Sequence, residues 1–191
     1  SSDLFMTDTL EMLPGLMVLI PAAIGMRGNI FGALGSRLGT AMHVGTFELS
    51  LRKGSILRQN IEASLIMTMV VSFLMGFLAK VISTAIGMES ISMQQFIFIS
   101  VLGGVLAGLV LLVVNVIVAT LGFRRNWDID NISAPLLTAA GDIVTLPMLF
   151  LAGLIVIKGE GVIDAAFYDV MTLLFLAITI FLICEAMCKR D

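Results

Sequence analysis

Five long apolar segments follow one another along the chain, separated by short polar connections. They run over residues 13–45, 61–87, 93–121, 134–157 and 166–187. Stretches of about twenty uncharged residues recur, and this is the length that an α-helix needs to cross about 30 Å of hydrocarbon. The pattern predicts an all-α fold, a polytopic membrane helix bundle of five spans. Because the connections are short, we expect one compact domain over residues 1–191.

The first segment differs from the others because its apolar run is interrupted. Leu13 to Met26 contains only fourteen residues, about 21 Å of helix, which is too short to span a bilayer alone. The span must therefore continue through Arg27 and Asn29. Pro21 and the nearby glycines predict a broken helix between Gly25 and Asn29. Backbone groups freed by such a break cannot face lipid, so this stretch is a candidate lining of a pore or cavity.

Composition supports the membrane assignment and excludes one class of partner. Charged residues make up 13% of the chain, whereas a soluble domain carries about 25%. The sequence contains no basic patch interleaved with aromatic residues, so we expect no nucleic-acid partner. The lipid bilayer is the expected environment, and a multi-pass protein of the cell membrane is the expected class.

The basic residues of the short connections predict an orientation. Arg52, Lys53 and Arg58 follow the first segment, a pair at 124–125 follows the third, and another pair at 189–190 follows the fifth. Under the rule that basic loops stay inside, these sites are cytoplasmic, with the N-terminus of this chain outside and the C-terminus in the cytoplasm. An external N-terminus without a basic leader suggests a further helix upstream in the natural protein.

Asp142 lies nine residues into the fourth apolar segment and therefore near mid-membrane. A carboxylate at that depth costs about 2.5–3.5 kcal/mol and should face the interior or water. Thr138 and Thr145 lie four residues before it and three after it, on the same helical face. This oxygen-rich stripe suits a hard cation. The alternative is a protonated Asp142 hydrogen-bonded between helices.

Other polar and small residues inside the spans have more local interpretations. Arg27 is expected to pair with an acid, contact backbone carbonyls or extend toward the interface. Arg37, closer to the cytoplasmic end, can extend its charged group to the interface. Asn115 is expected to join helices by hydrogen bonding, and the G-x-x-x-G pattern from Gly104 to Gly108 predicts close helix packing.

Two stretches of the chain match the signatures of a known family. The first reads I-P-A-A-I-G-M-R-G-N followed by L-G-S-R-L-G-T-A, and the second reads D-I-D-N-I-S-A-P-L-L-T-A-A-G-D-I-V-T-L. They resemble the MgtE magnesium-channel membrane domain, and most closely one repeat of the eukaryotic magnesium solute carriers, which carry this domain twice. The cytoplasmic regulatory region that MgtE channels place before the membrane domain is not in this sequence.

The resemblance implies a magnesium pathway at a C2 homodimer interface, lined by the first span and the helix of Asp142. In the family this aspartate contacts a Mg²⁺ ion that keeps its water shell, a design that suits an ion that dehydrates reluctantly. The remaining residues that the resemblance places at the ion pathway are Gly25, Gly28 and Asn29 of the first motif and Asp130 and Asn131 at the cytoplasmic mouth.

Three alternatives remain open at the level of sequence. A carrier that exchanges Mg²⁺ against Na⁺ or H⁺ would use similar broken helices. An intramembrane aspartyl protease would use Tyr168-Asp169 together with Asp142, but these motifs stand in the reverse order, and two carboxylates that share a proton must come within hydrogen-bonding reach. A membrane scaffold without transport would leave the polar stripe of Asp142 unexplained. The sequence therefore favours a non-enzymatic divalent cation transporter.

Overall fold

The computed structural model describes residues 16–87, 91–125, 129–159 and 163–188, although the side chains of 16, 129–131, 133, 134 and 186 are outside the described set. Five helices follow one another: α2 (Leu16–His43), α3 (Ile56–Ala85), α4 (Met93–Arg125), α5 (Ile129–Gly159) and α6 (Ala165–Cys188). All five are long and apolar enough to cross a membrane. Within the described residues, the predicted all-α bundle of five helices long and apolar enough to span a membrane is confirmed.

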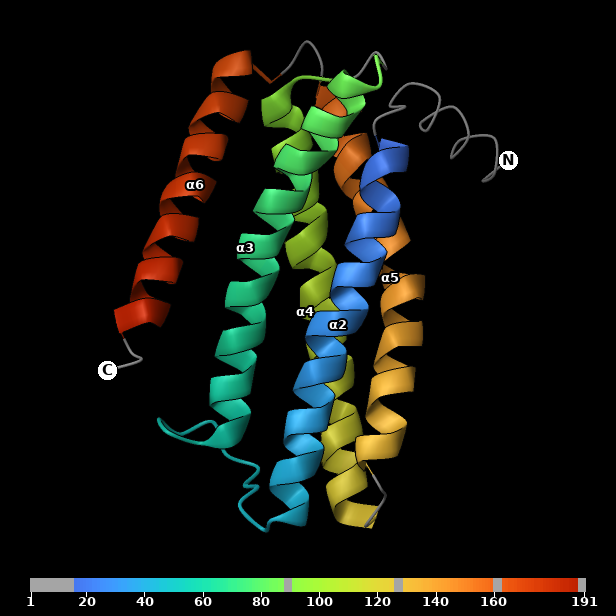
Figure 1. Cartoon of the computed structure of the whole chain (residues 1–191), viewed down its shortest axis with the longest axis vertical. Helices are drawn as coiled ribbons and strands as arrows, with labels where there is room; N and C mark the ends of the chain where they lie inside the picture. Colours follow the sequence, from blue (N-terminus) through green and yellow to red (C-terminus); the bar gives the residue numbers. More distant parts are fainter. Residues whose placement is uncertain (1–15, 88–90, 126–128, 160–162, 189–191) are drawn as a thin grey trace.

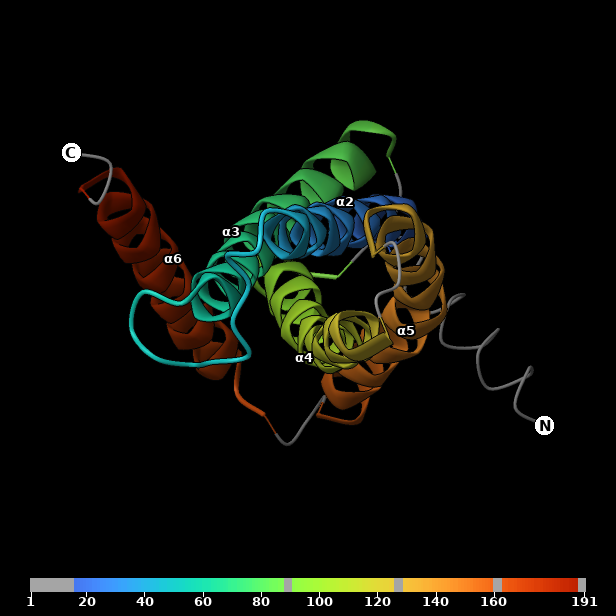
Figure 2. The same ribbon diagram turned by 90° about the horizontal axis from the view of Figure 1, so that it is seen from below.

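The helices run alternately up and down, so the connection between α2 and α3 and the end of α4, which both carry basic residues, lie at the same end of the bundle (Figure 1). α2, α4 and α5 pack tightly together, with α3 against α2 and α4. α6 packs against α3 and α4, and the end view shows it on the side opposite α5 (Figure 2). Among the helices that the structure describes, none therefore covers the side of the bundle formed by α2 and α5.

The predicted break in the first span is not present. α2 is one continuous α-helix from Leu16 to His43, with Pro21 inside it. Pro21 lies near the start of α2, where its missing N–H removes a single bond to the first turn. A glycine inside a helix costs only about 1 kcal/mol relative to alanine. Packing of α2 against α5 and α3 is enough to offset that cost.

The interior consists of two apolar layers. The first layer, near the start of α2, contains Leu19, Phe96, Ile99, Leu149 and Val156, and the second layer, near the end of α2, contains Phe31, Leu38, Leu57, Leu111 and Leu137. Arg27, only 1% exposed, lies on the turn of α2 between Ala23 of the first layer and Phe31 of the second. A buried arginine thus lies between the two apolar layers.

The predicted roles of the glycines and of Asn115 in α4 are confirmed. A Cβ added to Gly103 would lie 2.9 Å from Leu149 Cδ2, and one added to Gly108 would lie 3.1 Å from Thr68 Cγ2. The absent side chains therefore let α5 and α3 approach α4 closely. Asn115 Nδ2 donates to the Phe31 carbonyl at 3.3 Å, which joins α4 to α2.

Candidate functional site

Asp142 stands midway along α5, thirteen residues after its first residue and seventeen before its last. Its side chain is exposed on the surface of the single chain. Its neighbour Ile143 is 73% exposed, so this part of α5 points outward. A carboxylate at the middle of a spanning helix and on the outer surface cannot remain against hydrocarbon at low cost.

α2 and α5 approach each other closely beside Asp142. A Cβ added to Gly28 would lie 3.1 Å from Thr138 Cγ2, and a Cβ added to Gly141 would lie 3.7 Å from the Gly28 nitrogen. Gly141 and Gly28 face each other, so their chain neighbours Asp142 and Asn29 lie within one helical turn of the same level of the bundle. The absence of side chains at both glycines makes this approach possible.

The outward side of α2 and α5 at this level forms a polar surface, which we call the α2–α5 face. It comprises Gly25, Asn29, Thr138 and Asp142, all four exposed on the single chain. It offers a carboxylate, an amide and a hydroxyl as oxygen donors, which are ligands suited to a hard divalent cation or to its bound water. Within the described residues no group of three or more His, Cys, Asp or Glu side chains could hold a metal ion. Because Asp142 is the single carboxylate among the four residues of the face, the face suits an ion that keeps most of its water shell.

The remaining predicted site residues lie elsewhere. Thr145 is fully buried, and its hydroxyl has no hydrogen-bond partner within the described part of the chain. Gly28 is buried beneath Thr138, so it allows the close approach and does not line the surface. Asp130 and Asn131 belong to the first turn of α5, but their side chains are outside the described set.

Arg27 lies behind the α2–α5 face, inside the bundle. Its Nη1 donates to the Gly104 carbonyl of α4, and its Nη2 lies 3.5 Å from Ser72 Oγ of α3. Ser100 Oγ of α4 donates to the Ser72 carbonyl at 2.6 Å. Of the roles expected for Arg27, contact with a backbone carbonyl is confirmed, and the two contacts of its guanidinium join α2 to α4 and α3. The sequence did not predict which residues Arg27 contacts, because Ser72 and Gly104 lie more than forty residues from it along the chain.

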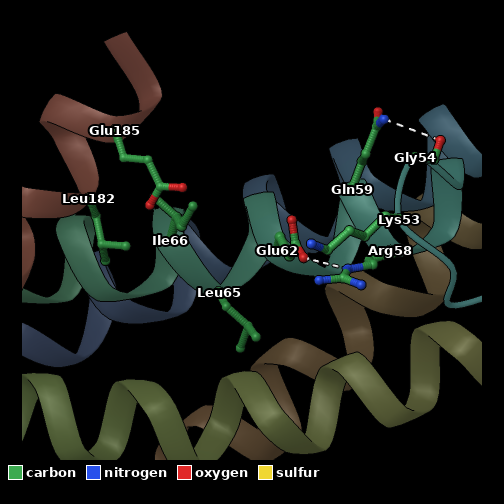
Figure 3. Close-up of a pocket in the computed structure, with 9 residues that line it drawn as sticks. All are labelled: Lys53, Gly54, Arg58, Gln59, Glu62, Leu65, Ile66, Leu182 and Glu185. Carbon is green, nitrogen blue, oxygen red and sulfur yellow. Dashed lines mark hydrogen bonds and ion pairs between the residues drawn. The ribbon is translucent and has the colours of Figure 1, made fainter. Parts of the chain in front are cut away.

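A separate groove of about 610 Å³ opens between the start of α3 and the end of α6 (Figure 3). Lys53 and Arg58 lie at one end of it and Glu185 at the other. Arg58 Nε pairs with Glu62 Oε1 at 2.7 Å. No residue of the α2–α5 face lines this groove, so it is no part of the candidate ion site.

The protease interpretation finds no support in the geometry. Asp169 is exposed near the start of α6, whereas Asp142 lies at the middle of α5, and α6 packs against α3 and α4. Tyr168 is buried in the first apolar layer, beside the start of α2. The two carboxylates therefore stand on different helices, and α5 and α6 lie on opposite sides of the bundle (Figure 2).

Comparison with known proteins identifies the family. The sequence profile of MgtE, described as a divalent cation transporter, matches residues 20–152. The chain belongs to the MgtE family. This family consists of transporters and not of enzymes, and with five spanning helices the chain is a multi-pass membrane protein.

Members of solute carrier family 41 are similar to the chain. Solute carrier family 41 member 2 of Xenopus laevis is 28% identical over 152 residues, which cover 74% of this chain and 26% of the relative. Solute carrier family 41 member 3 of Mus musculus is 28% identical over 144 residues, covering 71% of this chain and 28% of the relative. The chain thus spans about a quarter of the length of these relatives. No solved structure matches the chain.

Proposed function

We propose that this chain transports Mg²⁺ across the membrane as a symmetric homodimer, through a pathway that the α2–α5 faces of two copies enclose. The observation that carries the proposal is the exposed carboxylate of Asp142 at mid-helix. It stands level with Asn29 across the close contact of Gly28 with Thr138. The family match over residues 20–152 supports cation transport as the activity.

The exposure of Asp142 is also the argument for a dimer. A carboxylate that faced lipid would cost about 2.5–3.5 kcal/mol, and the outward Ile143 beside it is apolar and 73% exposed. A second copy related by a twofold axis would keep the carboxylate away from lipid and bury the apolar residues around it. It would place two Asp142 carboxylates around one water-filled path. Twofold closure is the commonest symmetry of homo-oligomers.

The ligand types of the α2–α5 face favour Mg²⁺. Oxygen donors without thiol or imidazole disfavour soft metals. Mg²⁺ keeps several waters and binds through one or two carboxylates, so a symmetric pair of Asp142 side chains with Asn29 and Thr138 is sufficient for recognition. The basic residues Arg52 and Lys53 in the connection to α3 support a cytoplasmic position for that end of the bundle.

The central experiment is Mg²⁺ uptake by proteoliposomes that contain Asp142→Ala or Asp142→Asn protein. We expect the alanine variant to lose uptake and remain dimeric, and the asparagine variant to lose preference for divalent over monovalent cations. Asp169→Ala is the matched control, because this exposed aspartate lies on α6, away from the α2–α5 face. Normal uptake by Asp142→Ala would refute the assignment.

The same proteoliposomes distinguish a channel mechanism from an exchange mechanism. A channel passes Mg²⁺ down its own gradient without Na⁺ or a proton gradient, and we expect this result. Uptake that requires an opposing Na⁺ or H⁺ gradient would identify an exchanger built on the same residues.

A further inference from the structure

Arg37 is the second arginine of α2, and its surroundings differ from those of Arg27. It lies eight residues after Asn29 and six before the end of α2 at His43, about 12 Å and 9 Å along the axis. Its side chain is exposed. Within the described part of the chain it has neither a hydrogen bond nor an ion pair, whereas Arg27 is buried and bound to Gly104.

Arg37 lies on the side of α2 that turns away from the α2–α5 face toward α3. Asn29, Ala33 and Arg37 follow one another at steps of four residues, and all three are exposed. Each such step turns the direction of the side chain by about 40°, so Arg37 lies round toward α3. Arg37 therefore lines the groove between α2 and α3, and it adjoins the proposed ion pathway through Asn29, which lines the same groove.

This groove has a volume of about 240 Å³, and both Asn29 and Arg37 line it from α2. Asn60 and Ser64 line it from α3. Asn60 is only 1% exposed. Its Nδ2 donates to the Ile56 carbonyl at 2.9 Å, but its Oδ1 has no hydrogen-bond partner within the described residues.

A buried acceptor without a donor and an arginine without an acceptor thus border the same groove. An unsatisfied buried carbonyl oxygen is costly, and a guanidinium group is a strong donor with several N–H groups. Rotation of the Arg37 side chain toward α3 would satisfy both groups. Rotation toward the pathway would place a positive charge where the cation leaves for the cytoplasm.

We propose that Arg37 is an electrostatic gate at the cytoplasmic end of the Mg²⁺ pathway, and that Asn60 is the docking residue that holds its guanidinium aside in the open state. The inference rests on the proposed function, because it assumes that cations pass along the α2–α5 face. Arg37 acts on the permeating ion through its charge, and Asn60 acts through the position of Arg37.

The size of the effect follows from Coulomb's law. One positive charge about 12 Å from a divalent ion lowers its occupancy about 3-fold in fully water-like surroundings and about 100-fold at an effective dielectric constant of about 20. For a monovalent ion the same factors are about 2-fold and about 10-fold. Removal of the charge should therefore raise divalent flux more than monovalent flux.

The experiment measures Mg²⁺ and Na⁺ uptake by proteoliposomes for the unmodified protein, Arg37→Gln, Arg37→Lys, Asn60→Asp and the double variant Arg37→Gln with Asn60→Asp. Arg52→Gln is the matched control, because it removes one exposed arginine from the same end of the bundle but from the connection to α3. A gain of flux cannot arise from misfolding, so the decisive results are increases.

We expect Arg37→Gln to raise Mg²⁺ uptake at least about 3-fold and Na⁺ uptake less, while Arg37→Lys keeps the slow rate. Asn60→Asp should also raise uptake, because a carboxylate draws the guanidinium into the groove, and it should add nothing once Arg37 is replaced. Equal effects of Arg37→Gln and Arg52→Gln would overturn the gate, as would an Asn60→Asp effect that persists without Arg37. Failure of the unmodified protein to transport Mg²⁺ would instead refute the proposed function and the gate with it.

Discussion

Replacement of Gly104 by alanine adds a single methyl group, and we expect it to lower the stability of the protein substantially. A Cβ added there would overlap Ser72 Oγ and would lie 2.9 Å from Ser72 Cβ and 3.0 Å from Arg27 Nη2. The Gly104 carbonyl also accepts the hydrogen bond from Arg27 Nη1. Gly104→Ala therefore forces α3 and α4 apart and displaces the buried guanidinium.

Two costs and one gain determine the expected magnitude. Overpacking of a well-packed interior costs about 1–3 kcal/mol, and loss of an interhelical hydrogen bond inside a membrane costs about 0.6–2 kcal/mol. Alanine gains about 1 kcal/mol over glycine in helix propensity. The net loss is about 1–4 kcal/mol, which corresponds to a fall in melting temperature of about 2–16 °C for a chain of this size.

Thermal unfolding of the purified protein in detergent measures this loss. Gly32→Ala is the matched control, because a Cβ at Gly32 of α2 would meet no atom within 4 Å, and its melting temperature should stay the same or rise. Ser72→Ala removes the overlapping oxygen, so the double variant with Gly104→Ala should recover part of the loss. Equal melting temperatures for Gly104→Ala and Gly32→Ala would refute the packing of these three helices.

The remaining predictions concern the α2–α5 contact, the α2–α4 contact and ion binding. Gly28→Ala would place a Cβ 3.1 Å from Thr138 Cγ2, so we expect reduced Mg²⁺ uptake that Thr138→Ser restores by removing that methyl group; uptake as low in the double variant would contradict this reasoning. Asn115→Leu loses the hydrogen bond to the Phe31 carbonyl and should cost about 0.6–2 kcal/mol, measured by thermal unfolding, where an unchanged melting temperature would argue against the contact. Mg²⁺ at a hundred times its Kd should stabilise the protein by about 2.7 kcal/mol, and Asp142→Asn should lose this shift; an equal shift in both proteins would place the bound ion elsewhere.

The outline of this protein is contained in its sequence. The five spans follow from apolar length, because the bilayer imposes a minimum run of about twenty residues on each helix whatever its neighbours. Asp142 stood out for the same reason, since a carboxylate within such a run is costly enough to need a function. Asn115 and Gly104 were also recognisable, because polar and small residues in spans usually serve helix contacts.

Relations between helices were decided by tertiary structure alone. The glycines near Asn29 suggested a broken helix, but α2 is continuous, because packing against α5 and α3 outweighs the weak preference of glycine. Helical spacing puts Thr138 and Thr145 on the same side of α5 as Asp142, yet only Thr138 is exposed and Thr145 is buried. The spacing of residues along one helix defines its faces. Which of these faces is buried depends on other helices, which are distant in the sequence and contact this helix only in the folded chain.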